Sequence, residues 1–397
     1  MIIIGGSTAE QELAKIASQR DVAPVITQAE REGRVAKVAA LLAEQSIDAL
    51  YLDATTSMDY FTGLRLHQSE RLHGLIITNK GALTYVCPAF EEPKVRGDVS
   101  LDGDFLVWEE EQSPTALITE RLKATSASGN VKLAVDELTP FFTVDGLMKA
   151  GGNSLEILNA APLIASCRMY KSAAEIALIK QAMAMTLQVQ HAAARVMVEG
   201  IDTRDVQAFL DAAHIKIGMD GPSTFKIVLF GEPTAYPHGV SYPQQLKQGD
   251  SVLVDTGATL HGYHSDITRT GFFGEVTELQ REVWELEAAM QQAAFAASQL
   301  GAPCSAPDTA ARAVLTAGGY GPGYKLPGTP HRAGHGIGMD VHEAPYIVKD
   351  NDLPLAPGMC FSIEPMICRY GEFGVRLEDH VYMTEDGPAW FTKPATA

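Results

Sequence analysis

The sequence Val-Asp-Thr-Gly-Ala spans residues 254–258, and Ser-Asp-Ile-Thr-Arg-Thr spans residues 265–270. The apolar run that ends at Asp255 is typical of a buried strand, and a second predicted strand begins directly after Asp266. Because a turn containing glycine joins them, we expect the strands to run antiparallel and to bring both carboxylates together. Two adjacent buried carboxylates repel each other, so they either share a proton or hold a cation.

Asp-Thr-Gly is also the motif of aspartic proteases, in which two such aspartates share one proton. The chain contains this tripeptide once and has no Asp-Ser-Gly, which excludes that chemistry. The remaining alternative is that Asp255 and Asp266 are ordinary turn residues. The acidic and histidine residues further along the chain argue against it.

The overall composition narrows the classes of protein. A chain of 397 residues predicts two domains. Its 31 basic and 49 acidic residues give a net charge of −18, which disfavours nucleic acid and anionic membranes as partners. The first residues lack a basic segment and a long apolar run, so we expect neither a signal peptide nor a membrane span. Five scattered cysteines fit a reducing cytoplasm better than a disulfide framework.

Residues 1–165 are predicted to form an α/β domain, because helical and strand patterns alternate along them. Asn79-Lys80-Gly81 separates two alternating apolar runs and predicts a hairpin. His67 and His73 stand alone and are interpreted as structural or surface residues. The expected helices are 31–45 and 114–124, and the expected strands are 47–52, 72–78, 82–86, 105–107 and 131–135.

Residues 166–397 are predicted to form a second domain. Ser172 and Glu175 form a capping box that begins a helix reaching about Val198, and a second helix ends near Gly218. Further helices are expected at 278–299 and 306–317. The glycine-rich segment around His335 lacks the strand that a nucleotide-binding loop requires, so we interpret its glycines as permitting a close backbone approach that positions His335.

Two glutamates complete a candidate metal site. Glu364 and Glu378 each lie in a predicted strand, 361–365 and 374–379, among apolar neighbours, where a carboxylate must be paired or bound to a metal. Together with Asp255, Asp266 and His335 they give an oxygen-rich set that suits two ions of manganese, cobalt, iron or zinc. Two such ions would share a bridging water as the nucleophile of a hydrolase.

These five positions resemble the ligand set of the pita-bread metallopeptidases, family M24, which includes methionine aminopeptidase, Xaa-Pro aminopeptidase and Xaa-Pro dipeptidase (prolidase). The resemblance covers about residues 170–390. It implies an α+β protein whose carboxy-terminal pita-bread catalytic domain follows a smaller creatinase-like α/β domain. The matching segments are Val-Asp-Thr-Gly-Ala, Ser-Asp-Ile-Thr-Arg-Thr, Gly-His-Gly-Ile-Gly-Met-Asp-Val-His-Glu, Ser-Ile-Glu-Pro and Val-Arg-Leu-Glu-Asp.

The resemblance also implies a role for each metal ligand. Asp255 would hold one metal ion, Asp266 and Glu378 would bridge both, and His335 and Glu364 would complete the second.

It further implies residues that act on the substrate. His238 and His342 match histidines near the scissile bond, and His331 matches a third that Xaa-Pro aminopeptidases carry. Arg376 matches an arginine that supports the site. Imidazoles in such places can shuttle a proton or donate a hydrogen bond to a developing oxyanion.

One position departs from the family pattern. Family peptidases commonly have Glu-Pro-Gly-x-Tyr, whereas Cys368 stands here at the tyrosine position. Our hypothesis is that Arg369 or Tyr370 substitutes in substrate binding, with Arg369 placed to hold a substrate carboxylate.

The resulting expectation is a cytoplasmic, homodimeric hydrolase that cleaves the Xaa-Pro bond, most simply of dipeptides. An Xaa-Pro aminopeptidase remains the first alternative. A non-peptide C–N hydrolase of the same fold, similar to ectoine hydrolase or creatinase, is the second. A metal-free binding protein is the third, and the intact ligand set argues against it.

Overall fold

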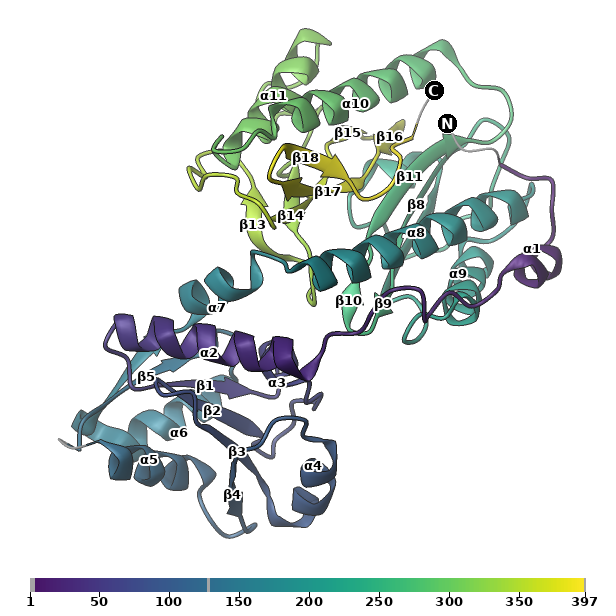
Figure 1. Cartoon of the computed structure of the whole chain (residues 1–397). Coiled ribbons are helices and arrows are strands. Elements are labelled where there is room, and N and C mark those ends of the chain that lie inside the picture. The colour runs from purple at the N-terminus through teal and green to yellow at the C-terminus, as the bar shows by residue number, and fades with distance from the viewer. Residues whose placement is uncertain (1–3, 127–128, 396–397) are drawn as a thin grey trace. The chain divides into compact units, whose positions relative to one another are not determined.

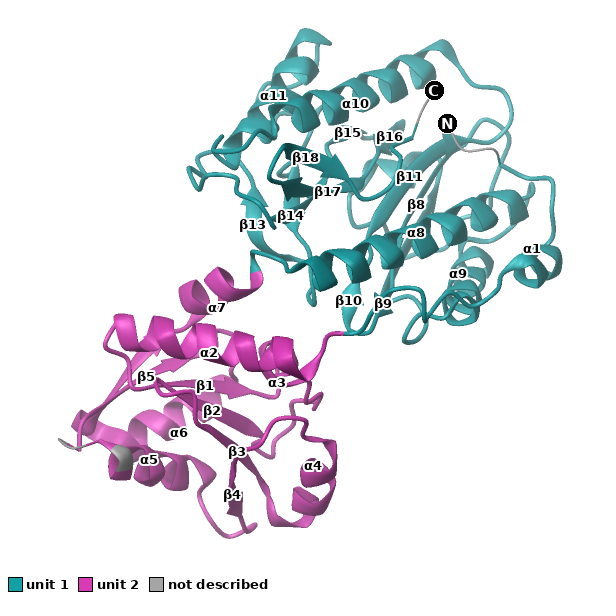
Figure 2. Ribbon diagram, in the orientation of Figure 1, with its two compact units in different colours: residues 1–25, 169–397 teal, residues 26–168 magenta. Residues whose placement is uncertain are grey.

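The chain divides into two units in the computed structural model, which describes residues 4–126 and 129–395 (Figure 1). The amino-terminal unit is Ile26–Arg168. The carboxy-terminal unit comprises the described residues of Met1–Val25 and Met169–Ala397 (Figure 2).

This division differs from the single boundary expected at residue 165. The helix α1 (Ala9–Lys15) belongs to the carboxy-terminal unit because Glu12 accepts hydrogen bonds from Arg195, 2.6 Å from its Nη2 and 2.9 Å from its Nε. Helix α7 (Ala161–Arg168) belongs to the amino-terminal unit. This ion pair, backbone hydrogen bonds such as that from Gln19 to the Ile217 carbonyl, and the ion pair of Arg20 with Asp220 hold residues 4–25 against the carboxy-terminal unit. The pattern along the chain carries no sign of these long-range contacts.

The amino-terminal unit is a six-stranded mixed sheet in the order β4-β3-β2-β1-β5-β6. The expected hairpin around residues 79–81 is confirmed, since β2 and β3 pair antiparallel. Figure 1 shows α2 on the opposite side of this sheet from α5 and α6. Its elements are α2 (Gln28–Glu44), α3 (Thr56–Thr62), α4 (Glu92–Asp98), α5 (Pro114–Thr125), α6 (Phe141–Gly151) and α7, the 3-10 turns η1 (Ala89–Glu91) and η2 (Gly152–Ser154), and the strands β1 (Ala49–Asp53), β2 (Gly74–Thr78), β3 (Leu83–Pro88), β4 (Asp104–Trp108), β5 (Val131–Val135) and β6 (Leu155–Asn159).

The carboxy-terminal unit is built from two larger sheets, β11-β8-β7 and β13-β12-β14-β17-β18, and from the hairpins β9-β10 and β15-β16. Helices α8 and α9 contact the strands of the first sheet, and α10 contacts β14 of the second. Its elements are α1, α8 (Ala173–Val196), α9 (Thr203–Ile217), α10 (Glu278–Ala297) and α11 (Ser305–Ala317), the 3-10 turn η3 (Glu232–Ala235), and the strands β7 (Phe225–Phe230), β8 (Ser251–Gly257), β9 (Thr259–Leu260), β10 (Tyr263–His264), β11 (Ile267–Phe272), β12 (Gly334–Gly336), β13 (Glu343–Ile347), β14 (Cys360–Ile363), β15 (Met366–Arg369), β16 (Phe373–Arg376), β17 (Asp379–Thr384) and β18 (Gly387–Trp390).

The helix beginnings follow the predicted caps. At α8 the full capping box is present, because Ser172 accepts from the backbone of Glu175 and the Glu175 side chain accepts from the backbone of Ser172. A buried face of α8, which includes Met183 and Val189, then anchors the helix in the unit.

Both predicted glutamate strands need correction. Glu364 follows the end of β14, and Glu378 lies between β16 and β17. The chain leaves the β15-β16 hairpin at Arg376 and joins the five-stranded sheet at Asp379, so residues 374–379 cannot form one strand. An isolated bridge with Thr268 of β11 fixes the backbone of Glu378 at this crossing.

Among the helices of residues 4–126 and 129–395, none combines the length and apolar character needed to traverse a bilayer.

Candidate metal centre

Antiparallel pairing of β8 and β11 brings the two aspartates of the opening motif to one end of a ladder. Asp255 lies opposite Thr268, and Asp266 immediately precedes β11. Both carboxylates are buried. A Cβ at Gly257 would overlap the carbonyl oxygen of Ser265, so only glycine permits this close approach. The expected strand geometry is confirmed, and its glycine is a steric requirement.

His335 lies at the centre of the remaining acidic residues. Its Nε2 is 3.0 Å from Glu364 Oε1, 3.6 Å from Asp266 Oδ2 and 3.9 Å from Glu378 Oε1. Ligand atoms around one ion lie no more than about 4.2 Å apart, twice a metal–ligand distance of about 2.1 Å. Cβ atoms at Gly334 and Gly336 would overlap neighbouring carbonyl oxygens, which confirms that these glycines let the backbone approach closely.

Arg376 and Thr268 hold the carboxylates in place. The buried guanidinium of Arg376 forms an ion pair with Asp255 and donates to Thr268 Oγ1 over 3.1 Å and to the Pro237 carbonyl over 3.0 Å. The same Thr268 hydroxyl donates to Glu378 Oε2 at 2.7 Å. Thr268 therefore connects Arg376 to Glu378, a role that sequence reasoning missed.

The donor set leaves oxygen atoms unused. Asp255 Oδ1, Asp266 Oδ1 and Glu378 Oε1 are buried and have no hydrogen-bond partner among the described residues. Burial raises the pKa of Asp266 and of Glu378 well above the usual carboxyl value, and mutual repulsion raises it further. One arginine cannot neutralise three buried carboxylates and the partly buried Glu364, so cations suit this arrangement chemically.

His335 and Glu364 stabilise each other's charge. Burial alone would lower the pKa of His335, but the Glu364 carboxylate and Asp266 raise it overall. Burial likewise would raise the pKa of Glu364, and His335 lowers it well below the usual value. This pairing of opposite charges and the binding of a cation compete for the same atoms.

Two further predicted histidines approach this cluster. The His342 ring lies edge-on to the His335 ring, with centroids 4.1 Å apart. Burial, together with the neighbouring His335, lowers the pKa of His342 to about 4, so it is neutral near pH 7. His331 donates from Nδ1 to the Arg332 carbonyl at 2.7 Å, which leaves Nε2 buried and unpartnered within the described part of the chain.

His238 is exposed and lines a pocket of about 230 Å³, which it shares with residues of β7. Burial is the main cause that lowers the pKa of His331 and of His342, and His238 lowers both pKa values further. The roles of the three histidines at the substrate stay predictions.

Arg369 and Tyr370 make contacts of a different kind. Arg369 donates from Nη2 to both carboxylate oxygens of Glu372 at 2.8 Å and from Nη1 to the Tyr320 hydroxyl at 2.8 Å. Tyr370 is exposed, and its ring lies 4.9 Å from the Tyr236 ring.

Cys368 itself is fully buried in an apolar cluster with Leu229, Leu253 and Met366. Burial raises the pKa of its thiol to about 12, so the side chain is a neutral core residue.

His380 is a second residue that sequence reasoning missed. Asp266, His335, Glu378 and His380 each offer a ligand atom, and these four atoms lie within 4.8 Å of one another. Burial lowers the pKa of His380 well below the usual value, and His335 lowers it further, while Glu364 and the Asp266 backbone oppose the shift. The available signal was spacing, since His380 follows Glu378 by two residues.

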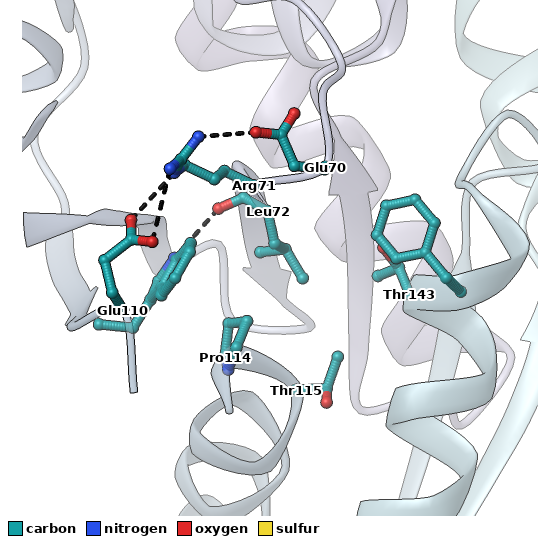
Figure 3. Close-up of a pocket in the computed structure, with 9 residues that line it drawn as sticks. Glu70, Arg71, Leu72, Glu110, Pro114, Thr115 and Thr143 are labelled. Carbon is teal, nitrogen blue, oxygen red and sulfur yellow. Dashed lines mark hydrogen bonds and ion pairs between the residues drawn. The ribbon is translucent and has the colours of Figure 1, made fainter. Parts of the chain in front are cut away.

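A separate pocket of about 390 Å³ lies in the amino-terminal unit and is lined by Glu70, Trp108 and Phe142 among others (Figure 3). Arg71, its basic residue, is already paired with Glu70 and Glu110, as the dashed lines show. The lining residues include no histidine or cysteine, so this pocket lacks the groups that the cluster around His335 supplies.

Comparison with known proteins gives matches along most of the chain. The family model described as "Metallopeptidase family M24" matches residues 177–385, and "Creatinase/Prolidase N-terminal domain" matches residues 34–170. The Xaa-Pro dipeptidase of Lactobacillus delbrueckii subsp. lactis is 33% identical over 358 residues, which cover 88% of this chain and 94% of that protein.

Two solved structures resemble the whole chain. Dipeptidase PepE from Mycobacterium ulcerans has a TM-score of 0.86 at 31% identity and covers 93% of this chain and 97% of its own. A recombinant prolidase from Thermococcus sibiricus has a TM-score of 0.82 at 29% identity and covers 91% and 96%, respectively.

Proposed function

This chain belongs to metallopeptidase family M24, with a creatinase-like amino-terminal domain and a pita-bread catalytic domain, and from that premise we propose that it is a dinuclear metal-dependent exopeptidase that hydrolyses the Xaa-Pro bond of dipeptides. The observation that carries the proposal is the convergence of Asp266, Glu364 and Glu378 on His335. One oxygen each of Asp255, Asp266 and Glu378 is buried and left unpartnered among the described residues. The dipeptidase names of similar proteins support the substrate class.

In this proposal the ions are held by Asp255, Asp266, His335, Glu364 and Glu378. The unpartnered oxygens of Asp255, Asp266 and Glu378 support these assignments. Divalent manganese, cobalt or zinc fits a set of carboxylates with an imidazole. When bound, a pair of such ions would neutralise the carboxylates, polarise the scissile carbonyl and activate a water molecule near neutral pH.

The protein residues around the ions supply orientation and proton transfer. Arg376 holds Asp255 through their ion pair, and Thr268 holds Glu378. A neutral His342 can donate one hydrogen bond to the oxyanion that develops at the scissile carbonyl. His331 Nε2 has no hydrogen-bond partner among the residues that the structure describes, and His238 lines the pocket of about 230 Å³. Each imidazole can therefore bind the peptide or carry a proton to the leaving amine.

The substrate preference follows from the chemistry of proline and from the residues near β15. A proline nitrogen carries no N–H, so a site for Xaa-Pro needs no acceptor at that atom. Arg369 is the proposed clamp for the carboxylate of a dipeptide, with Tyr370 beside it. Because Glu372 now occupies the guanidinium of Arg369, a substrate carboxylate would have to replace Glu372. The homodimer belongs to this proposal on the family resemblance alone, and the cytoplasmic location belongs to it on the five scattered cysteines.

The test compares hydrolysis of an Xaa-Pro dipeptide and an Xaa-Pro-Xaa tripeptide by metal-stripped protein after Mn²⁺, Co²⁺ or Zn²⁺ is restored. We expect metal-dependent cleavage of the dipeptide, loss of cleavage in Glu378→Gln, and wild-type rates in the matched Glu385→Gln variant, whose side chain is exposed. Preference for the tripeptide would indicate an Xaa-Pro aminopeptidase. Metal binding without cleavage of either peptide would favour a non-peptide C–N hydrolase.

A further inference from the structure

His380 lies on the face of its strand that points toward the candidate metal centre. Side chains alternate along an extended chain, so Glu378 and His380 share one face and Asp379 takes the other. The contacts agree with this alternation, because Asp379 pairs with Arg269 and accepts from Gln291. On β17, His380 pairs with Ser362 of β14, whose hydroxyl donates to Glu364.

The environment of His380 is unusual for a core histidine. The residue is fully buried, and neither Nδ1 nor Nε2 meets the geometry of a hydrogen bond with any described residue. Buried imidazoles normally satisfy at least one nitrogen, as His214 does with Thr186 and Ser223. Two fully buried imidazole nitrogens without a hydrogen-bond partner among the described residues require an explanation. A metal ion bound to one of the two nitrogens is such an explanation.

The neighbours of His380 are themselves metal-ligating groups. Its ring centroid is 5.9 Å from that of His335, and the two rings lie nearly edge to face. One ligand atom from each of Asp266, His335, Glu378 and His380 fits within 4.8 Å of the others. This spread is slightly larger than the separation of about 4.2 Å that ligands of a single ion allow, so the four side chains would draw together around an ion.

We propose that His380 is a sixth protein ligand, which gives one ion of the centre a second imidazole nitrogen beside that of His335. The inference rests on the metal centre of the proposed function and adds a residue to it. Imidazole favours zinc, cobalt, iron and copper, whereas carboxylate and water favour magnesium and manganese. A second imidazole should therefore move the preference of that ion from manganese toward zinc or cobalt.

A position outside the coordination sphere is the competing explanation. In that arrangement His380 would orient a ligand by hydrogen bonding, with the Asp266 backbone as its partner, and its loss could still weaken metal binding about 10- to 100-fold. Affinity alone cannot separate the two arrangements, so the experiment must count the nitrogens bound to the metal.

The experiment is X-ray absorption spectroscopy of the zinc- or cobalt-loaded full chain, which counts coordinated imidazoles, together with calorimetric titration of Mn²⁺ and Zn²⁺. We compare wild type, His380→Gln, His380→Asn and the matched control His191→Gln, whose imidazole is exposed on α8. We expect the wild type and the control to hold at least two imidazoles per chain. Each His380 variant should hold one fewer and lose more than tenfold in zinc affinity relative to manganese.

Three results would overturn the inference. The first is one imidazole per chain in the wild type, a measurement that does not depend on how the variants fold. The second is an unchanged imidazole count in a folded His380 variant, even if affinity falls, because that result places His380 outside the coordination sphere. The third is an unchanged ratio of zinc to manganese affinity. A wild-type protein that binds no metal would instead reject the proposed function itself.

Discussion

The buried ion pair between Arg269 and Asp379 gives the sharpest stability prediction. The two guanidinium nitrogens donate to the two carboxylate oxygens over 2.6 and 3.2 Å, and both side chains are almost fully buried. Asp379 directly follows Glu378, so the pair also fixes the beginning of β17 next to this proposed ligand. Asp379→Asn removes the negative charge and leaves Arg269 buried beside a neutral amide.

The expected loss follows from the cost of an unpaired buried charge. Removing one member of such a pair costs about 3–5 kcal/mol. Arg269 keeps hydrogen bonds to the carbonyls of Thr268 and Glu378, so we expect the lower end, about 3 kcal/mol. With a urea dependence of about 3 kcal/mol per M, the unfolding midpoint should fall by about 1 M.

The assay is urea unfolding followed by tryptophan fluorescence. Trp284 and Trp390 lie in the carboxy-terminal unit and Trp108 in the amino-terminal unit, so a Trp108→Phe background makes the signal specific to the carboxy-terminal unit. A chelator in the buffer removes any contribution of bound metal to stability.

Two further variants serve as comparisons for the stability of Asp379→Asn. Arg204→Met removes an ion pair of an exposed guanidinium with Asp202 in the same unit, and it should leave the urea midpoint close to that of the wild type. The double variant Arg269→Met with Asp379→Leu should be more stable than Asp379→Asn, since it leaves no unpaired charge. The reasoning fails if Asp379→Asn unfolds at the same urea concentration as Arg204→Met.

The remaining predictions concern pH, metal affinity and substrate binding. Burial lowers the pKa of His214 to about 4 from an ordinary 6.5, so stability is full above pH 6.5 and should fall by up to about 3 kcal/mol toward pH 4. When the free energy of unfolding is measured by urea denaturation across this pH range, it should fall less steeply with decreasing pH in His214→Gln than in the wild type. An equal dependence on pH in the two proteins would contradict the lowered pKa of His214. Thr268→Val should weaken metal binding about 10- to 100-fold in a calorimetric titration, because it removes the hydroxyl that donates to Glu378. Thr268→Ser should bind metal about as tightly as the wild type, and equal affinity of Thr268→Val and the wild type would exclude a supporting role at Glu378. Arg369→Ala should raise KM for an Xaa-Pro dipeptide at least about tenfold, whereas Glu372→Gln should not raise it. Unchanged KM and kcat in Arg369→Ala would contradict the proposal that Arg369 binds the substrate carboxylate.

Local patterns were sufficient for much of the fold. The β8 and β11 pairing followed from an apolar run, a glycine turn and two aspartates, and the α8 beginning followed from Ser172 and Glu175. These features depend on neighbours in the sequence. Periodicity along the chain reports such short-range preferences directly.

Features set by distant partners were not predictable in this way. Glu378 lies between two strands because the chain changes sheet there, and the alternation of apolar and charged residues from Val375 to Glu378 hides the change. Arg369 is held by Tyr320, 49 residues earlier. His380 lies just beyond the predicted strand 374–379, and only the fold shows that it belongs to β17 and lies near the carboxylates.

The dinuclear centre is tested most directly by a titration of metal-stripped protein with Zn²⁺, Co²⁺ or Mn²⁺ in which bound metal and hydrolysis of an Xaa-Pro dipeptide are measured together. We expect no cleavage in the presence of a chelator and a rate that rises until two ions are bound per chain. Cleavage that persists in the chelator, or full activity before a second ion binds, would contradict a dinuclear metallopeptidase.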